Sequence, residues 1–309
     1  MKELIKHTWY PIIKSKKIPS RGIVERRIFG EDYIVYRDEK KSIRIKERWC
    51  PHRGADMKKG IIKKSCIACP YHGWEFNHID GRLEKIPSQK KTNVKLKLGE
   101  VQFYDDGHIL WCYYGNGKSC AISSPVNLLE DGHVTSGMKN CKCNWKNVIE
   151  NSLDASHPNF VHDKSFSDSD NTCVKIKKLD INEYGFESIV EINHKDLQEL
   201  TTDVKFNFNY PNVTHIEFER SGKIFQTVVT TLPKTENETD IYWYFVQNSL
   251  KSENTIMRNI IDCVIYITMD MVLNEDIEIL ENLKPNFPSK LYVKADIMQN
   301  IFHYMLKYL

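Results

Sequence analysis

Short runs of β-branched and aromatic residues, separated by turn residues, dominate the first 120 positions of this chain. Such runs predict strands, here at residues 33–36, 42–47, 94–98 and 109–114. The dipeptides Asp80-Gly81 and Asn116-Gly117 predict tight turns between strands. The pattern therefore predicts a β-rich first domain.

The rest of the chain mixes strand and helix patterns. Strand-like runs occur at residues 173–176, 187–192, 204–208, 213–218, 224–232 and 241–246. Helices are predicted at residues 144–157, before Pro158, at 254–283, before Pro285, and at 295–306. A segment rich in serine, proline and glycine follows residue 120 and places the domain boundary near that position.

These patterns predict an α+β protein of two domains. Residues 1–120 are expected to form an all-β domain, and residues 121–309 a domain with an antiparallel sheet flanked by helices. A length of 309 residues agrees with two domains of roughly 150 residues each.

The composition excludes several classes of protein. With 28% charged and 41% hydrophobic residues, the chain has a globular composition. A net charge of +3 is small for a protein that binds nucleic acid through its phosphates. The longest apolar stretch, residues 260–273, contains two aspartates, so no membrane span is expected. Residues 1–22 have no apolar core, so no secretory signal is expected.

The nine cysteines are an odd number in a long chain without a signal segment. This argues against a disulfide framework and for a reducing compartment, the cytoplasm. In such a compartment, cysteines and histidines that cluster in the sequence indicate a metal site.

Two short segments each combine a cysteine with a histidine. Cys50 and His52 stand in CPHRG, and Cys69 and His72 stand in CPYHGW after a gap of 16 residues. A Rieske [2Fe–2S] cluster needs two cysteines on one iron and two histidines on the other, and this spacing supplies that set. The flanking prolines and glycines give tight turns, and Trp74 can shield a cluster from water.

Two other interpretations compete with the cluster. Zinc could bind Cys66, Cys69, His72 and Cys50, because the first two have the spacing of a zinc-binding pair. Alternatively, the cysteines could be ordinary small core residues. The turn residues beside Cys50 and Cys69 favour the cluster over both alternatives.

A second polar group lies in the predicted helix at 144–157. One face of that helix carries Asn144, Asn147, Asn151, Asp154 and His157. A solvated face is normally rich in lysine and glutamate, whereas this set is typical of a buried polar network. His162 follows Pro158, which breaks the helix and lets the two imidazoles converge.

Two imidazoles and one carboxylate on one face of an iron form the facial triad of non-haem Fe(II) oxygenases. In the predicted helix 254–283, Asp276 stands within an apolar stripe, where an unpaired carboxylate is costly and a metal would be a partner. Asp262 is on the same stripe, roughly 21 Å away by helical rise, so only one of the two can bind the metal. Glu275 and Glu278 lie off the stripe and are expected to be solvated. The other members of the stripe are Met269, Val272, Leu273, Ile279, Leu280 and Leu283.

Together, CPHRGADMKKG, CPYHGW and the motif N-x2-D-x2-H-x4-H resemble Rieske non-haem iron oxygenases over nearly the whole chain. The resemblance implies that residues 1–120 are the Rieske domain and residues 121–309 the catalytic domain. It implies that Cys50 and Cys69 bind one iron of a [2Fe–2S] cluster and that His52 and His72 bind the other. Cys66 has no counterpart among the ligands.

The resemblance also covers the second group. It implies that His157, His162 and Asp276 bind a mononuclear Fe(II), with Asn151 and Asp154 as further catalytic residues. The chain is most similar to the shorter, single-subunit-type branch, which includes vanillate-type and dicamba-type O-demethylases and saxitoxin-tailoring hydroxylases.

For function, the resemblance implies a monooxygenase that uses O2 to hydroxylate or O/N-demethylate a small organic substrate. A dihydroxylating dioxygenase and a non-catalytic electron-transfer protein are the alternatives from the same motifs. A third alternative is a binding module that is stabilised by zinc. The family forms head-to-tail rings, usually trimers, in which a residue at the position of Asp154 bridges a cluster histidine of one subunit and an iron histidine of the next.

Electrons for this chemistry must come from elsewhere, because the sequence has no G-x-G-x-x-G dinucleotide motif. A separate ferredoxin or flavin reductase is therefore expected as partner. Four lysines between the cluster segments fit either a docking patch for an acidic donor or a solvated loop. These are Lys58, Lys59, Lys63 and Lys64.

Overall fold

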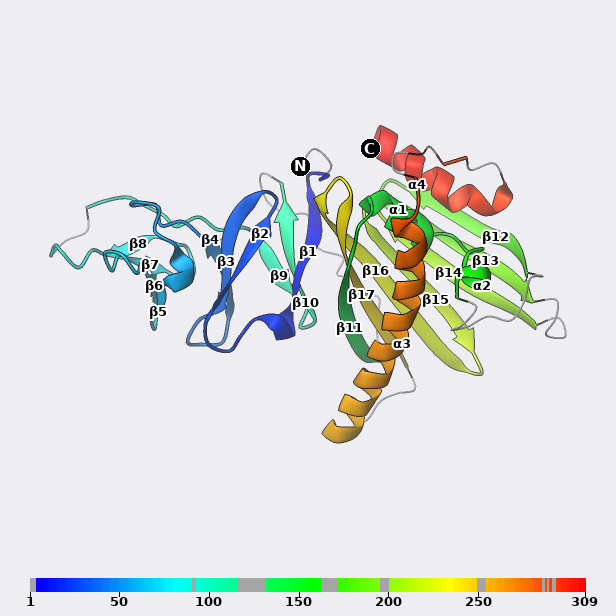
Figure 1. The fold of residues 1–309 in the computed structure, drawn as a ribbon, viewed down its shortest axis with the longest axis horizontal. Helices are drawn as coiled ribbons and strands as arrows, with labels where there is room; N and C mark the ends of the chain where they lie inside the picture. Colours follow the sequence, from blue (N-terminus) through cyan, green and yellow to red (C-terminus); the bar gives the residue numbers. More distant parts are fainter. Residues whose placement is uncertain are drawn as a thin grey trace. The chain divides into compact units, whose positions relative to one another are not determined.

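The computed structural model describes residues 4–90, 93–115, 132–162, 172–194, 200–248, 254–284, 287, 289–290 and 293–309. The chain divides into two compact units, Met1–Ile122 and Ser123–Leu309, called unit 1 and unit 2 below (Figure 1). The predicted domain boundary near residue 120 and the predicted turn at Asn116-Gly117 lie outside the described residues.

The described part of unit 1 consists of short antiparallel strands in three sheets, ordered β1-β10-β9, β2-β3-β4 and β5-β6-β7-β8. The strands are β1 (Thr8–Lys14), β2 (Ile23–Ile28), β3 (Glu31–Arg37), β4 (Ile43–Glu47), β5 (Ile61–Ile62), β6 (Cys66–Ala68), β7 (Glu75–Asn77), β8 (Leu83–Lys85), β9 (Phe103–Asp105) and β10 (Ile109–Tyr114). A 3-10 turn, Met57–Lys59, follows the first cysteine segment. Alternate residues of β3, Ile34 and Tyr36, enter a core that also contains Cys50 and Cys69, the two cysteines predicted to bind the cluster.

Most of the strand predictions for this unit are confirmed. The runs at 33–36, 42–47 and 109–114 form β3, β4 and β10. The turn at Asp80-Gly81 joins β7 to β8, and Gly81 has φ +72°, which favours glycine. The strand predicted at 94–98 is wrong, because that segment forms only an isolated bridge between Lys97 and Arg82. Strands β5 to β8 are too short to show alternation in the sequence.

Unit 2 contains a seven-stranded antiparallel sheet in the order β11-β17-β16-β15-β14-β13-β12. Its strands are β11 (His133–Cys141), β12 (Thr172–Asn182), β13 (Gly185–His194), β14 (Leu200–Asn209), β15 (Val213–Arg220), β16 (Lys223–Thr235) and β17 (Glu238–Gln247). At the β11–β17 pair, Gly137 lies opposite Trp243, and a Cβ there would lie 2.0 Å from the indole ring. Glycine therefore leaves room for the buried Trp243, which packs against α3 (Thr255–Glu281).

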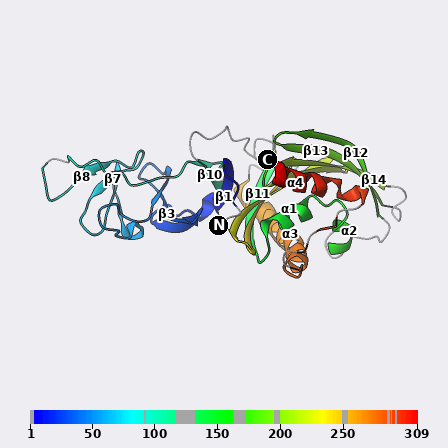
Figure 2. The same cartoon turned by 90° about the horizontal axis from the view of Figure 1, so that it is seen from above.

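The helices of unit 2 lie on one face of this sheet (Figures 1 and 2). They are α1 (Trp145–Ser152), α2 (Pro158–Val161), α3 (Thr255–Glu281) and α4 (Ile297–Tyr308). Asn144 caps α1 and Asn254 caps α3, each through its side-chain oxygen. Phe302 of α4 packs edge-on against Trp145 of α1 and Phe208 of β14, which ties that helix to the sheet.

The helix predicted at 144–157 is wrong at its C-terminal end. The α-helix stops at Ser152. The Leu153 amide is shared between the carbonyls of Ile149 and Glu150, the Asp154 amide reaches only the carbonyl of Asn151, and a separate turn begins at Pro158. Asp154 and His157 therefore lie in the connection between α1 and α2 and not on one helical face.

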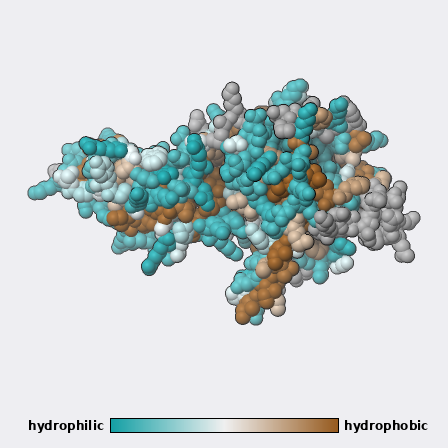
Figure 3. Space-filling model, viewed as in Figure 1, coloured by the Kyte–Doolittle hydropathy of each residue, from teal (hydrophilic) through white to brown (hydrophobic). Residues whose placement is uncertain are grey.

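The apolar stripe predicted in the long helix is largely confirmed. Met269, Val272, Leu273, Asp276 and Leu280 are buried. Ile279 and Leu283, the other predicted members, are exposed. The N-terminal half of α3 projects an apolar surface, seen in brown in Figure 3. No helix in the described ranges combines the length and hydropathy needed to cross a membrane.

Candidate metal centres

The two cysteine loops of unit 1 repeat one backbone arrangement. In each loop the cysteine N–H donates to the carbonyl five residues later, and the cysteine carbonyl accepts from the glycine four residues later. Both glycines have positive φ, +66° and +69°, which explains why glycine closes each turn. The bonds are Cys50 to Ala55 (2.9 Å), Gly54 to Cys50 (2.8 Å), Cys69 to Trp74 (2.8 Å) and Gly73 to Cys69 (3.0 Å).

These loops bring the four predicted cluster residues together. The Cys50 and Cys69 thiols are buried and interact with each other. The rings of His52 and His72 lie 4.8 Å apart, and Trp74 stacks on His52 at 3.9 Å with an interplanar angle of 6°. Nδ1 of His52 is buried and has no hydrogen-bond partner in the described structure. A buried nitrogen without a partner fits a group that a metal would satisfy.

Protonation in this site follows from desolvation. Burial raises the pKa of the Cys50 thiol to about 11, and the backbone N–H groups of His52 and Arg53 offset part of that rise. Burial, and then the neighbouring His72, lower the pKa of His52. At neutral pH the cysteine is therefore protonated without metal, and metal binding must displace its proton. His52 is neutral and keeps a lone pair for a metal.

Cys66 does not join this set. Its buried thiol donates to Glu84 Oε2 at 3.0 Å. Unit 2 contains the one group in the described ranges in which three Cys, His, Asp or Glu side chains could hold a metal ion. The ligand atoms of that group all lie within 4.8 Å of each other. Because the Cys66 thiol bonds to Glu84, the structure gives no support to a single zinc ion bound by Cys50, Cys66, Cys69 and His72.

That group in unit 2 is His157, His162 and Asp276. Nε2 of each histidine lies 3.4 Å from Asp276 Oδ1. His157 comes from the connection between α1 and α2, His162 from the end of α2, and Asp276 from the buried face of α3. Three ligand atoms at this spacing suit one ion with bonds of about 2.1 Å, which would hold ligands at right angles about 3 Å apart.

Hydrogen bonds at the far side of each imidazole fix its tautomer. Nδ1–H of His157 donates to the Asp154 carbonyl at 2.9 Å, and Nδ1–H of His162 donates to Glu275 Oε2 at 2.9 Å. Since both acceptors are oxygens without a hydrogen, the proton sits on Nδ1 and leaves the Nε2 lone pair directed at Asp276. Both histidines are therefore prepared to bind a cation through Nε2.

Asn151 holds the third member of the group. Its Nδ2 donates to Asp276 Oδ1 at 3.0 Å, from the last turn of α1. The competing carboxylate, Asp262, accepts from Thr135 at 2.6 Å and lies 3.1 Å from His133 Nε2. The Asp262 carboxylate therefore has partners other than the two candidate histidine ligands.

The expectation that Glu275 is solvated is wrong. Its side chain is 15% exposed and faces His162, whose side chain is 4% exposed. The apolar stripe of one helix does not reveal this contact, because α2 also packs on α3. Glu278, one helical turn away from Asn274, is exposed as expected.

Asp154 does not contact His157 through its carboxylate, as a shared helical face would require. Its Oδ1 accepts from the backbone N–H of Ser156 at 2.7 Å, and only its carbonyl reaches the imidazole. Asp154 is half-buried, and among the described residues its second carboxylate oxygen has no hydrogen-bond partner.

An all-β domain with paired Cys–His loops, followed by a helix-covered sheet with a two-histidine, one-carboxylate group, defines the class of Rieske oxygenases. Residues 8–104 match the family model of the Rieske [2Fe–2S] domain, and residues 141–302 match that of the vanillate O-demethylase oxygenase C-terminal domain. The chain belongs to the family of Rieske oxygenases that carry this vanillate O-demethylase-type C-terminal domain.

Known relatives agree with this family. The phthalate 4,5-dioxygenase oxygenase subunit of Pseudomonas putida is 25% identical over 173 residues, which are 54% of this chain and 39% of the relative. The 5,5'-dehydrodivanillate O-demethylase oxygenase subunit of a Sphingobium species is 28% identical over 172 residues, 52% of this chain and 40% of the relative. The match thus spans about two-fifths of the length of these relatives. They are oxygenase subunits, that is, parts of oxidoreductases.

A similarity of fold to solved structures covers nearly the whole chain. The crystal structure of dicamba monooxygenase bound to dicamba has a TM-score of 0.75 with this protein, covering 98% of this chain and 97% of the other at 15% identity. The predicted α+β class, with an N-terminal all-β domain and an antiparallel sheet flanked by helices, is confirmed.

Proposed function

We propose that this protein is a monooxygenase that uses O2 and externally supplied electrons to hydroxylate, or to O- or N-demethylate, a small organic substrate. The observation that carries the proposal is the convergence of His157, His162 and Asp276 in a chain that also has paired Cys–His loops. The 2-His-1-carboxylate set leaves positions open for O2 and substrate. A purely electron-carrying protein would not need it.

In this proposal, Cys50 and Cys69 hold one iron of a [2Fe–2S] cluster, and His52 and His72 hold the other. His157, His162 and Asp276 hold Fe(II). When bound, the cluster supplies single electrons and Fe(II) supplies the activation of O2. The complete proposed ligand sets are therefore Cys50, His52, Cys69 and His72 for the cluster, and His157, His162 and Asp276 for the mononuclear iron.

The residues around these ligands keep them oriented. Asn151 donates to Asp276 and so fixes which carboxylate oxygen faces the two imidazoles. Glu275 and the Asp154 carbonyl hold the protons of His162 and His157 on Nδ1. Trp74 covers one face of His52 and excludes water from it. Such supporting hydrogen bonds commonly decide metal affinity.

We further propose that the protein works as a homotrimer with a separate ferredoxin or flavin reductase. The family resemblance supports a ring in which the Asp154 carboxylate bridges to a cluster histidine of the next subunit. A heterologous contact that closes gives such a ring. The free cysteines in both units support a reducing compartment, the cytoplasm.

The function is tested by metal content and product analysis. Loaded protein is expected to carry about three irons and about two acid-labile sulfides per chain. A panel of aromatic methyl ethers, N-methyl compounds and unsubstituted rings, with a surrogate reductase and ¹⁸O₂, should give hydroxylated or demethylated products with at most one labelled atom. Two labelled atoms in a cis-diol would instead support a dihydroxylating dioxygenase. Stoichiometric zinc without sulfide would contradict the proposal.

Glu275→Gln is expected to weaken Fe(II) binding about 10-fold or more, because the neutral amide no longer draws the Nδ1 proton and His162 becomes a poorer donor. Titration of the iron-free protein with Fe(II) measures this without turnover. The matched control is Glu278→Gln, three residues further along α3 with an exposed side chain. Equal affinity in the two variants would show that Glu275 does not support the site.

Asp154→Asn is expected to retain both metals and lower turnover about 10- to 100-fold. The carbonyl that holds His157 is backbone and unchanged, and the new amide oxygen can still accept from Ser156. Only the charge proposed to bridge subunits is removed. Rapid-mixing measurement of electron transfer from the reduced cluster tests this. Normal transfer, or a wild-type protein active as a dilute monomer, would refute the bridging role.

A further inference from the structure

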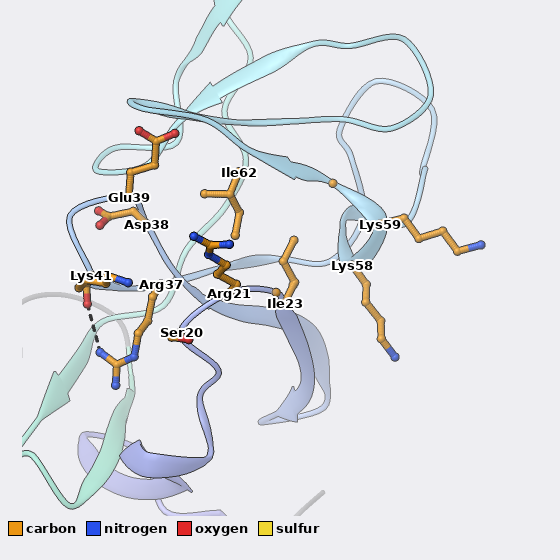
Figure 4. Close-up of a pocket in the computed structure, with 12 residues that line it drawn as sticks. Ser20, Arg21, Ile23, Arg37, Asp38, Glu39, Lys41, Lys58, Lys59 and Ile62 are labelled. Atoms are coloured by element: carbon orange, nitrogen blue, oxygen red, sulfur yellow. Dashed lines mark hydrogen bonds between the residues drawn. The ribbon is translucent and has the colours of Figure 1, made fainter.

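Unit 1 contains a cavity of about 690 Å³ that none of the proposed metal ligands lines (Figure 4). Its walls come from three segments, residues 20–23, 37–41 and 58–62. The first precedes and enters β2, the second links β3 to β4, and the third runs from the 3-10 turn into β5. We call this cavity the basic pocket.

Most charges in the basic pocket are positive and uncompensated. Among the described residues, Arg21, Lys41 and Lys59 form no ion pair, and Arg37 bonds only to the carbonyls of Lys41 and Ser15. Lys58 is paired with Glu25 at 3.0 Å. These unpaired cations create a positive field in a concave surface, where low-dielectric walls strengthen it.

The carboxylates of the pocket offset this field only in part. Asp38 is already bonded to Arg44 at 2.8 Å and to the backbone amides of Lys40 and Ser42. The negative charge of Asp38 is therefore neutralised by partners in and near the connection from β3 to β4. Glu39, an exposed residue, is the other carboxylate of the lining. The pocket is consequently suited to an acidic partner.

Two residues of the basic pocket are apolar, Ile23 and Ile62, and they link it to the core of unit 1. Figure 4 draws Arg21 beside Ile23 and below Ile62. Both isoleucines pack against the core that contains Cys50 and Cys69. Neither His52 nor His72 belongs to that core. A partner seated in the pocket would thus contact side chains that pack against the core around the two cysteines.

We propose that the basic pocket is the docking surface of an acidic, ferredoxin-type electron donor, and that electrons reach the cluster from its cysteine side. The inference rests on the proposed function, since it needs the cluster. In the transfer, one electron leaves the reduced iron–sulfur centre of the donor and enters the oxidised cluster, and no covalent bond changes. Acidic side chains of the donor meet Arg21, Lys41 and Lys59, while Ile23 and Ile62 exclude water from the contact.

The test is the rate at which a reduced, acidic plant-type [2Fe–2S] ferredoxin reduces the cluster, followed by its absorbance in rapid mixing. The triple variant Arg21→Glu, Lys41→Glu, Lys59→Glu is expected to lower the second-order rate constant about ten-fold or more at low ionic strength. The wild-type rate should fall as salt rises, whereas the variant rate should rise, because attraction has become repulsion.

Two controls make the result specific. Photoreduced deazariboflavin, an uncharged small reductant, should reduce both proteins at the same rate, which shows that fold and cluster are intact. A second triple variant with the same charge change outside the pocket, Arg27→Glu, Lys90→Glu, Lys95→Glu, should keep the ferredoxin rate within about two-fold.

The proposal is overturned if the pocket variant is reduced by ferredoxin as fast as the wild type, or if both triple variants slow equally. Inhibition by millimolar inorganic phosphate at constant ionic strength would also overturn it, since it would identify a small-anion site. Wild-type protein that assembles no cluster would show no absorbance before any donor is added, and would refute the proposed function itself.

Discussion

Asp276→Ala is expected to lose the mononuclear iron and turnover while the visible spectrum of the Rieske cluster stays unchanged. The substitution removes the oxygen that both Nε2 atoms face at 3.4 Å, and it leaves Asn151 without its acceptor. Two histidines alone give a weak site for Fe(II), which prefers the full 2-His-1-carboxylate set. Iron and sulfide analysis, with the absorbance of the cluster as internal reference, measures the loss.

His157→Ala and His162→Ala are expected to behave in the same way, since each removes one nitrogen ligand from the same ion. The matched control is Asp262→Ala on the same helix, whose carboxylate is bonded to Thr135 instead. It should keep the iron. Retention of iron and activity in Asp276→Ala would show that another carboxylate completes the site.

The cluster loops could be predicted from the sequence because their geometry is local. Each cysteine and its glycine are bonded within six consecutive residues, so spacing and turn residues already determine the loop. The contact between the loops needs only a short connection through β5 and β6. Trp74 follows the second loop directly, which explains why a shielding role could be anticipated, whereas its stacking on His52 is a contact between the two loops that the spacing does not show.

The second centre was predictable only in part. Asp276 could be recognised because a carboxylate in an apolar stripe is rare and needs a partner. Glu275 gave no such signal, since its role depends on α2 packing beside α3, and a four-residue helix has no periodicity to read. The contact with His162 is tertiary and invisible to the pattern of one helix.

The end of α1 explains the error at Asp154. Helical periodicity placed Asp154 and His157 on one face, but the chain tightens after Ser152 and the connection turns before Pro158. The imidazole is then held by a backbone carbonyl, which carries no side-chain signature in the sequence. The carboxylate accepts from the amide of Ser156 instead of contacting the imidazole.

Cys50→Ala and Cys69→Ala are expected to abolish the cluster altogether, with loss of its colour, its sulfide and all turnover. Each change removes one of the two thiolates proposed for the same iron. The nearby Cys66 thiol is bonded to Glu84 and is not expected to replace the lost ligand. The metal site in unit 2 should still bind Fe(II), because its ligands come entirely from α2, α3 and the connection before α2.

Cys66→Ala is the matched control, three residues before Cys69 and equally buried. Its thiol donates to Glu84, so the change should cost about 1–2 kcal/mol of stability and leave iron and sulfide content unchanged. Thermal unfolding measures the first effect and metal analysis the second. If Cys66→Ala lost the cluster while Cys50→Ala kept its iron, the metal would be bound by the closely spaced pair Cys66 and Cys69, and the Rieske ligand assignment would be wrong.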